Sequence, residues 1–196
     1  MIFCGYDIEL PQPWHDIAYN ELRVWEKYYL PVDVKGLTVL DVGAGAGETA
    51  AFYKYHGAKK VVSIQPDWDS DYKSPVPALR KNAGIIGDVE VIPEFFKLEH
   101  MKIPHDFAKF DCEGGETLLY DWSEPLKPCI IEAHSDEIAG ELCRRFPLKR
   151  VYPLSQDRWM LWFLHPLSSP LPEFVKPPGA MIPERDCPEY LTQFRP

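Results

Sequence analysis

Three glycines at alternate positions, Gly43, Gly45 and Gly47, follow an acid, Asp41, at the end of an apolar run that begins at Leu37. Glycine has no Cβ and accepts positive φ, so the chain can turn sharply here and leave its N–H groups open to a ligand. Helix-forming residues come directly after the turn, and a helix that begins there points its positive end at the same place. The stretch therefore predicts a strand, a ligand-binding turn and a helix.

The spacing of these glycines distinguishes two cofactors. A dinucleotide fingerprint needs G-x-G-x-x-G, but the sixth position counted from Gly43 is Glu48, and counted from Gly45 it is Ala50. The D-x-G-x-G-x-G pattern that starts at Asp41 instead resembles the first motif of S-adenosylmethionine-dependent methyltransferases. The resemblance implies S-adenosyl-L-methionine as the cofactor. It implies that the residues binding this cofactor include Asp41, Gly43, Ala44, Gly45 and Gly47.

The same resemblance implies an acid at the end of the second strand, which would accept hydrogen bonds from the ribose hydroxyls. Here the strand at residues 60–64 is followed by Gln65, Pro66 and Asp67. A glutamine carbonyl accepts a hydrogen bond but is neutral, so it would hold the ribose less strongly than a carboxylate does. Gln65 and Asp67 are therefore both candidates for the ribose.

A second motif restricts the resemblance to one family among these methyltransferases. Residues 109–116 read KFDCEGGE, which resembles the K-I-D-V-E-G-x-E motif of FkbM-type methyltransferases. The likeness covers about residues 36–166, and it implies O-methylation of a small-molecule acceptor. Residues 93–106 form a shorter segment than FkbM-type proteins usually carry between their third and fourth strands. Much of the cover on the substrate side is thus expected to be missing, unless residues 1–14 or the C-terminal tail supply it.

Acids and a histidine gather at the carboxyl ends of the fourth and fifth predicted strands. Methyl transfer is an in-line displacement that depends mostly on positioning in a dry pocket, and a hydroxyl acceptor also needs a base. Caps and structural hydrogen bonds are the alternative roles for these side chains. A magnesium ion on Asp111, His134 and Asp136, as in catechol-type methyltransferases, is a further alternative, but hard-ion sites usually need more carboxylates, so we expect no metal. The catalytic candidates are Asp111, which is also a candidate for cofactor binding, Glu113, Glu132 and His134.

Strands and helices alternate along most of the chain, which predicts a parallel sheet. The last two strands, at 149–154 and 159–165, are separated by a link too short for a parallel crossover, so they form an antiparallel hairpin. The predicted fold class is α/β: a Rossmann-like, doubly wound, seven-stranded sheet, mostly parallel with its last strand antiparallel, and helices on both faces. The other strands are predicted at 37–42, 60–64, 89–92, 107–112 and 129–133, and the helices at 16–30, 48–56, 75–82, 116–122 and 135–146.

The chain divides by composition into three parts. Residues 1–30 form an N-terminal arm and its helix, and within them residues 1–14 show no period and are expected to be irregular. Residues 31–166 form the S-adenosylmethionine-binding domain. Residues 167–196 are a proline-dense tail, because so many prolines remove the donors that a helix or sheet needs.

Charge and composition limit the partners. The formal net charge of -9 and the pI of about 5.1 argue against a nucleic-acid acceptor, although a local basic patch would be compatible with them. No apolar run approaches the roughly 20 residues of a membrane span, and the first ten residues lack the basic start of a signal peptide. Five widely spaced cysteines fit a reducing compartment, so we expect a cytoplasmic protein with no membrane partner. Two other hypotheses compete with that of a small-molecule O-methyltransferase: a methyltransferase that acts on RNA or protein, and a non-catalytic binding protein of the same fold. The sequence does not determine the oligomeric state.

Overall fold

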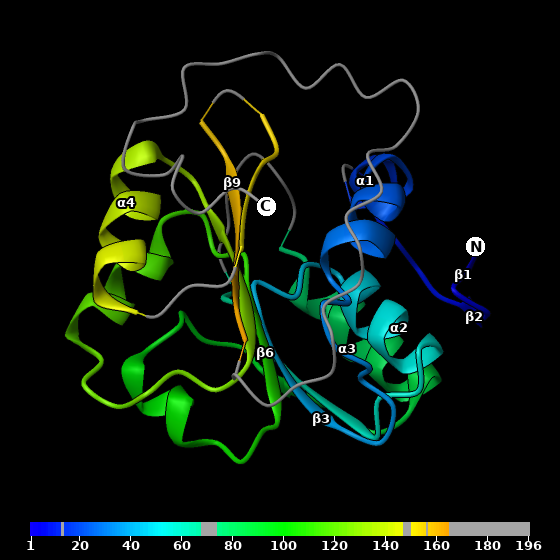
Figure 1. The fold of residues 1–196 in the computed structure, drawn as a ribbon. Coiled ribbons are helices and arrows are strands. Elements are labelled where there is room, and N and C mark those ends of the chain that lie inside the picture. The colour runs from blue at the N-terminus through cyan, green and yellow to red at the C-terminus, as the bar shows by residue number, and fades with distance from the viewer. Residues whose placement is uncertain (13, 68–73, 147–149, 156, 165–196) are drawn as a thin grey trace.

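The computed structural model describes residues 1–12, 14–67, 74–146, 150–155 and 157–164. Its centre is a seven-stranded sheet with the order β5-β4-β3-β6-β7-β9-β8 (Figure 1). The first five of these strands run parallel to one another, and β9 lies antiparallel between β7 and β8. The strands are β3 (Thr38–Val42), β4 (Lys60–Ile64), β5 (Val89–Ile92), β6 (Phe107–Phe110), β7 (Cys129–Ala133), β8 (Arg150–Pro153) and β9 (Trp159–Phe163).

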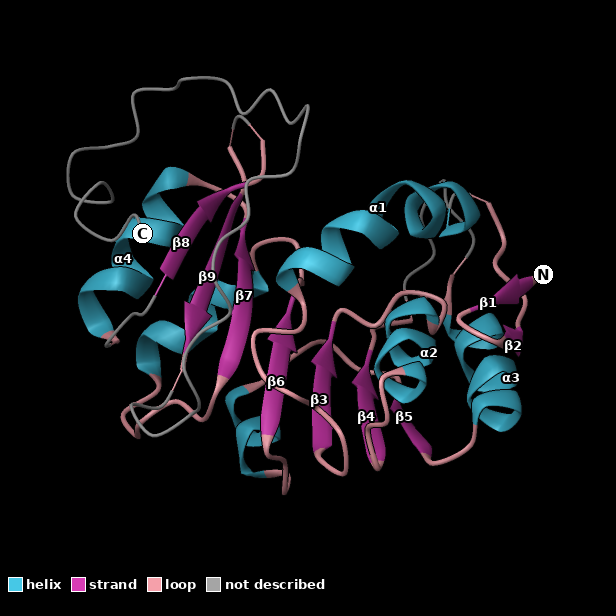
Figure 2. Ribbon diagram, turned by 45° about the vertical axis from the view of Figure 1, so that its right-hand side comes forward, coloured by secondary structure: helices cyan, strands magenta, loops and turns pink. Residues whose placement is uncertain are grey.

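Helices cover both faces of the sheet, with α4 on one side of it and α2 and α3 on the other (Figure 2). The α4 helix begins as the sequence predicts, because the Ser135 side chain accepts a hydrogen bond from the N–H of Ile138. No helix in the described part of the chain is long and apolar enough to cross a membrane. The helices are α1 (Trp14–Tyr28), α2 (Glu48–Tyr55), α3 (Val76–Ile86) and α4 (Asp136–Arg145), with short 3₁₀ helices η1 (Leu98–Lys102) and η2 (Gly115–Asp121).

Successive residues of each strand point to opposite faces, which gives the protein two cores. Leu40 and Val42 of β3 pack on the face that carries α4, η1 and η2. Val39 packs on the face that carries α1 and α2, together with Trp25 and Phe52. The predicted α/β sheet, including its antiparallel last strand, is therefore confirmed.

Several local predictions were wrong. Residues 1–14 are not irregular throughout: β1 (Ile2–Phe3) and β2 (Tyr6–Asp7) form a small antiparallel ribbon, too short to leave a period in the sequence. The helix predicted at 75–82 is longer than expected: α3 continues to Ile86 and ends where Gly87 takes a φ of 78°. The predicted helix at 116–122 is a 3₁₀ helix, η2. The predicted tail at 167–196 lies outside the described residues.

Candidate functional site

The glycine loop leaves β3 in a conformation that only glycine accepts without strain. Gly43 and Gly45 have φ values of 78° and 55°. A Cβ on Gly43 would lie 1.6 Å from the carbonyl oxygen of Asp111, and a Cβ on Gly45 would lie 2.1 Å from Oε1 of Glu48. The turn therefore packs directly on the end of β6 and on the first residue of α2, and both positions require glycine.

A cavity of about 520 Å³ opens above this loop, at the carboxyl edge of β3, β4 and β6. This volume lies within the range of small-molecule sites. Its wall combines the loop with apolar side chains of α1 and of the segment after β5, among them Ile17 and the 66% exposed Phe95. Of the predicted site residues, those that border the cavity are Gly43, Gly45, Gln65, Asp111 and Glu113.

The remaining residues predicted to bind the cofactor do not border this cavity. Asp41, Ala44 and Gly47 are buried in the loop and its supports. Asp67 is exposed and accepts a hydrogen bond from the Ser74 hydroxyl. The structure thus separates the two ribose candidates, with Gln65 on the wall of the cavity and Asp67 on the outside.

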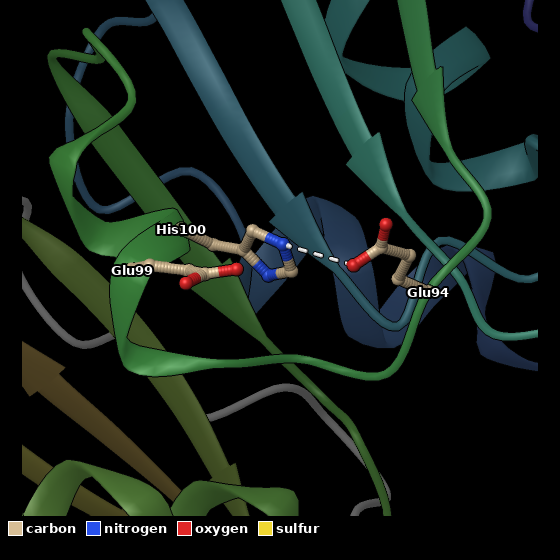
Figure 3. Close-up of side chains that lie close together, drawn as sticks. All are labelled: Glu94, Glu99 and His100. Carbon is tan, nitrogen blue, oxygen red and sulfur yellow. Dashed lines mark ion pairs between the residues drawn. The ribbon is translucent and has the colours of Figure 1, made fainter.

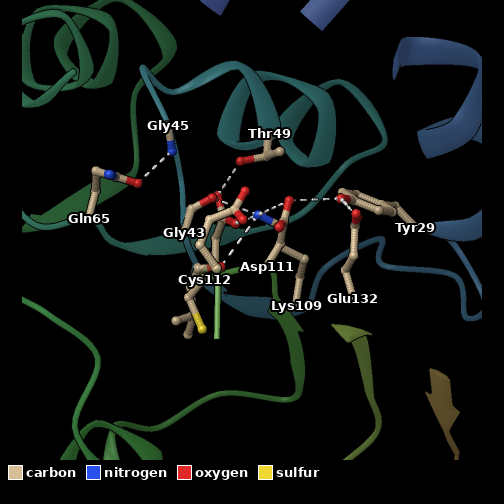
Figure 4. Close-up of polar contacts among 12 residues, drawn as sticks. Tyr29, Gly43, Gly45, Thr49, Gln65, Lys109, Asp111, Cys112 and Glu132 are labelled. Atoms are coloured by element: carbon tan, nitrogen blue, oxygen red, sulfur yellow. Dashed lines mark hydrogen bonds and ion pairs between the residues drawn. The ribbon is translucent and has the colours of Figure 1, made fainter. Parts of the chain in front are cut away.

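Gln65 is tied to the glycine loop. Its side-chain oxygen accepts the Gly45 N–H at 2.8 Å, and the residue is 2% exposed (Figure 4). The backbone N–H of Gly45 can only donate, so the atom of the Gln65 amide that faces it must be the oxygen. The other end of that amide, Nε2, is the end that can donate hydrogen bonds. Gln65 therefore holds the shape of the loop at a place where both residues border the cavity.

A buried ion pair supports the loop from below. Asp41 and Lys109 are paired residues of the parallel strands β3 and β6, so both side chains lie on one face. The Lys109 ammonium is 3.3 Å from Asp41 and donates to the carbonyl of Gly43 at 2.7 Å, while Asp41 also accepts the Thr49 hydroxyl at 2.6 Å (Figure 4). Burial alone would lower the pKa of Lys109, but Asp41 and Asp111 outweigh it and raise that pKa, so Lys109 stays charged.

His134 does not border the cavity, but it lies among carboxylates directly beside it. Its Nδ1 is 3.0 Å from Oε1 of Glu116, which is fully buried, and its Nε2 is 3.5 Å from both Asp111 and Glu113. Burial would lower the pKa of His134, but hydrogen bonds to Asp111 and Glu116 prevail and raise it to about 10. At neutral pH the side chain is therefore an imidazolium. Burial opposes ionisation of Asp111, but Lys109 and His134 together hold its pKa at about 2.

Glu132, beside this group, has a pKa close to neutrality. Burial and the charge of Asp111 raise the pKa of Glu132 to about 7, against the opposing charge of Arg158. Arg158 donates to it at 3.1 Å, and the Tyr29 hydroxyl lies 3.4 Å from Glu132 and 3.3 Å from Asp111 (Figure 4). A buried tyrosine thus bridges a strongly acidic carboxylate and a weakly acidic one.

The structure brings together Asp111, Glu113 and His134 closely enough for a common metal ion. Asp136, the third ligand in the magnesium alternative, instead accepts the Trp159 indole N–H at 2.7 Å. Arg158 lies 3.6 Å from Glu113. Cations of the protein thus already neutralise part of this cluster.

A second cluster consists of Glu94, Glu99 and His100, which follow β5 (Figure 3). The Nδ1 atom of His100 accepts the backbone N–H of Lys97 at 3.1 Å, so the neutral ring carries its proton on Nε2. That nitrogen lies 3.9 Å from Glu94, and Lys97 pairs with the same carboxylate at 2.5 Å. This arrangement is an ion-pair cluster with a lysine at its centre, and a ring nitrogen that bears a proton cannot ligate a metal.

Solved structures similar to this chain include S-adenosylmethionine-dependent methyltransferases. Fibrillarin from Aeropyrum pernix, solved with bound S-adenosyl-L-methionine, matches 74% of this chain and 75% of its own at 14% identity and a TM-score of 0.56. The ribosomal protein L11 methylase from Lactobacillus delbrueckii subsp. bulgaricus matches 79% of each chain at 19% identity and a TM-score of 0.50.

A third similar structure is an O-methyltransferase from neocarzinostatin biosynthesis, solved with S-adenosylmethionine and 2-hydroxy-5-methyl naphthoic acid. It matches 76% of this chain and 56% of its own at 11% identity and a TM-score of 0.51. No protein-family model and no curated protein sequence matches the chain. The comparisons therefore define the class I methyltransferase fold, and they leave the FkbM-type resemblance as a prediction.

Several residues of the site were not among those predicted. Glu48 directly follows the loop, but an acid in the first turn of a helix is common, so the sequence did not mark it as a site residue. Tyr29 and Arg158 come from distant parts of the chain, and only the folded sheet brings them to β6 and β7. For Lys109 the signal was present, because a lysine inside an apolar strand needs a buried partner.

Proposed function

We propose that this protein is an S-adenosylmethionine-dependent methyltransferase that transfers the methyl group to an oxygen of a small-molecule acceptor. The observation that carries the proposal is the glycine loop itself, where Gly43 and Gly45 border a cavity at the carboxyl edge of a methyltransferase-type sheet. Side chains at those two positions would collide with Asp111 and Glu48, so the loop could not keep the shape that lines the cavity. When bound, S-adenosylmethionine supplies the electrophilic methyl group.

The pKa values of the cluster divide the acid–base work among its residues. Asp111 borders the cavity, so it would accept the hydrogen bond of the acceptor hydroxyl and orient it. Because the pKa of Asp111 is low, Asp111 holds the proton only weakly. His134 is already protonated and cannot receive it. The proton would pass through the bridging hydroxyl of Tyr29 to Glu132, whose pKa of about 7 suits a base at neutral pH.

This assignment modifies the roles expected from the sequence. Asp111 keeps its place as the residue in contact with the acceptor. Glu113 and His134 become positioning residues, because the imidazolium lies 3.5 Å from both carboxylates and Arg158 lies 3.6 Å from Glu113. Glu113 holds a φ of 52°, which is costly for a residue with a side chain, so its place beside His134 is maintained by the surrounding structure.

The acceptor side of the cavity favours a molecule with an apolar body. Trp14, Ile17, Phe95 and Leu118 border it, and the exposed fractions of Phe95 and Leu118 are 66% and 39%. A formal net charge of -9 disfavours RNA as the acceptor. The FkbM-type resemblance of residues 109–116 points in the same direction and belongs to this proposal.

The test has two parts. Calorimetry should detect S-adenosylmethionine binding in the micromolar range and no binding of NAD. A cell extract, incubated with the protein and tritiated-methyl cofactor, should carry label in its small-molecule fraction. Label in RNA or protein would overturn the proposed acceptor class, and binding without labelling of any fraction would support a non-catalytic binding protein instead.

A further inference from the structure

Glu48 is a buried acid to which no role has been assigned so far, and it directly follows the glycine loop in the chain. It is the first residue of α2 and is 3% exposed. Its side chain borders the cavity beside Gly45 and Lys109. Its Oε1 atom lies against the α-carbon of Gly45, at the place that a side chain there would occupy. Glu48 is therefore part of the surface that a ligand on the loop would meet.

The second oxygen of this carboxyl group, Oε2, is buried and has no hydrogen-bond partner among the described residues. Buried polar atoms in folded proteins are nearly always paired, because an unpaired one forfeits its hydration without compensation. Because Glu48 borders the cavity, its unpaired acceptor is a position that a donor of the ligand can reach once the side chain adjusts.

Burial gives the Glu48 carboxyl group an unusual ionisation. Burial raises its pKa to about 8, against the opposing effects of backbone N–H groups and of Lys109. The free protein therefore holds Glu48 mainly as the neutral acid at pH 7. The charged groups that face it are Asp41 on β3 and Lys109 on β6, with Glu21, Asp111 and Arg158 on the cavity wall.

S-adenosylmethionine carries a sulfonium and an ammonium against a single carboxylate, so its net charge is positive. We propose that Glu48 is the counter-ion of S-adenosylmethionine and that its Oε2 atom receives the cationic methionine end of the cofactor. This inference rests on the proposed function. Binding would shift Glu48 to its carboxylate form, and the displaced proton would leave to the solvent. The cofactor's charge and the new carboxylate then balance within the buried site.

Proton release distinguishes this role from a structural one. S-adenosylmethionine should be titrated calorimetrically into the protein at pH 7 in two buffers of different ionisation enthalpy, because the difference in heat counts the protons exchanged. The wild-type protein should release a proton as it binds. Glu48→Gln, which copies the uncharged form, should release none and should bind about tenfold more weakly, as expected when one charge-assisted hydrogen bond is lost.

The matched control is Glu137→Gln, which changes an exposed acid in the first turn of another helix, α4. It should keep both the affinity and the proton release of the wild type, and thermal unfolding should confirm that both variants fold. Cofactor binding without proton release in the wild type, or unchanged binding and release in Glu48→Gln, would overturn the inference while the proposed function stands. A wild-type protein that binds no S-adenosylmethionine would overturn both.

Discussion

The imidazole of His134 lies 3.0 Å from the fully buried carboxylate of Glu116, measured from Nδ1 to Oε1. The same Glu116 oxygen accepts the backbone N–H of Cys112 at 3.1 Å. Glu116 therefore links the turn after β6 to the end of β7, and it holds the ring so that Nε2 faces Asp111 and Glu113.

The charge of His134 should make stability depend on pH. Its pKa rises from an unfolded value of about 6.5 to about 10 in the folded protein, so its contribution to stability is complete below pH 6.5 and is lost as the pH rises through 10. Urea denaturation should show the free energy of unfolding falling over this interval, and His134→Asn should show a smaller fall. Equal slopes for the two proteins would contradict the assignment of the imidazolium.

Removing Glu116 should be costly, because it leaves a buried imidazolium without its nearest partner. We expect Glu116→Ala to lower the free energy of unfolding by about 3 kcal/mol. Glu124→Ala, at an exposed position after η2, should change it by less than about 0.5 kcal/mol. A small effect of Glu116→Ala in chemical denaturation would mean that water replaces the carboxylate.

Gly36 and Gly43 share a φ of 78°, so substituting each of them allows the cost of backbone strain to be measured apart from the cost of steric overlap. Gly36→Ala meets no atom within 4 Å and should cost only the strain of a left-handed residue, about 1 kcal/mol. Gly43→Ala places its Cβ 1.6 Å from the Asp111 carbonyl oxygen, so it should cost several times more and abolish cofactor binding. Thermal unfolding and calorimetry would check both, and similar losses for the two variants would refute the close approach.

Gln65 is the residue that we propose to hold the cofactor's ribose. In Gln65→Glu, one carboxylate oxygen can keep the hydrogen bond from Gly45 while the other accepts a ribose hydroxyl. We expect about fivefold tighter binding of S-adenosylmethionine, which corresponds to about 1 kcal/mol. Gln65→Met should bind more weakly, because it leaves the Gly45 N–H unpaired. The dissociation constants of the three proteins would be compared in one buffer.

The proposed proton route predicts a pH profile. Methyl transfer should rise with pH through about 7, as Glu132 loses its proton. In Glu132→Gln the rise should disappear and the rate at pH 8 should fall about 100-fold. Tyr29→Phe should lower kcat without changing cofactor affinity, because it removes only the hydroxyl between Asp111 and Glu132. A normal profile in Glu132→Gln would exclude this residue as the base.

Chelation tests the expectation of a metal-free site. Arg158 already pairs with Glu132 and lies near Glu113, and the Lys109 ammonium is 3.7 Å from Asp111. These cations lead us to expect that excess EDTA leaves the rate of methyl transfer within about twofold of its original value, a margin below about 0.5 kcal/mol. Loss of activity that added magnesium restores would instead assign the cluster a metal.

The sheet could be predicted because its strands carry strong and local patterns. A run such as residues 37–42 is apolar on both faces, and the short link before Trp159 excludes a parallel crossover. Short elements carry no such pattern, which is why the β1–β2 ribbon and the 3₁₀ character of η2 were missed.

The site was less predictable, since its contacts depend on register and on long-range packing. Asp41 meets Lys109 only because β3 and β6 pair in one particular register. Tyr29 reaches Asp111 from a position 82 residues earlier in the chain. The sequence motifs identified the loop and the acids after β6, but not which acids would be protonated, because burial and neighbouring charges decide that together.

The contact between Gly43 and the carbonyl of Asp111 leaves no room for a methyl group between the cofactor loop and the acceptor turn. The glycine loop and the turn after β6 therefore pack as one unit on neighbouring strands, and the sheet sets the spacing between them. In the proposed methyltransferase, this fixed spacing would select acceptors by the length between their apolar body and their reacting oxygen.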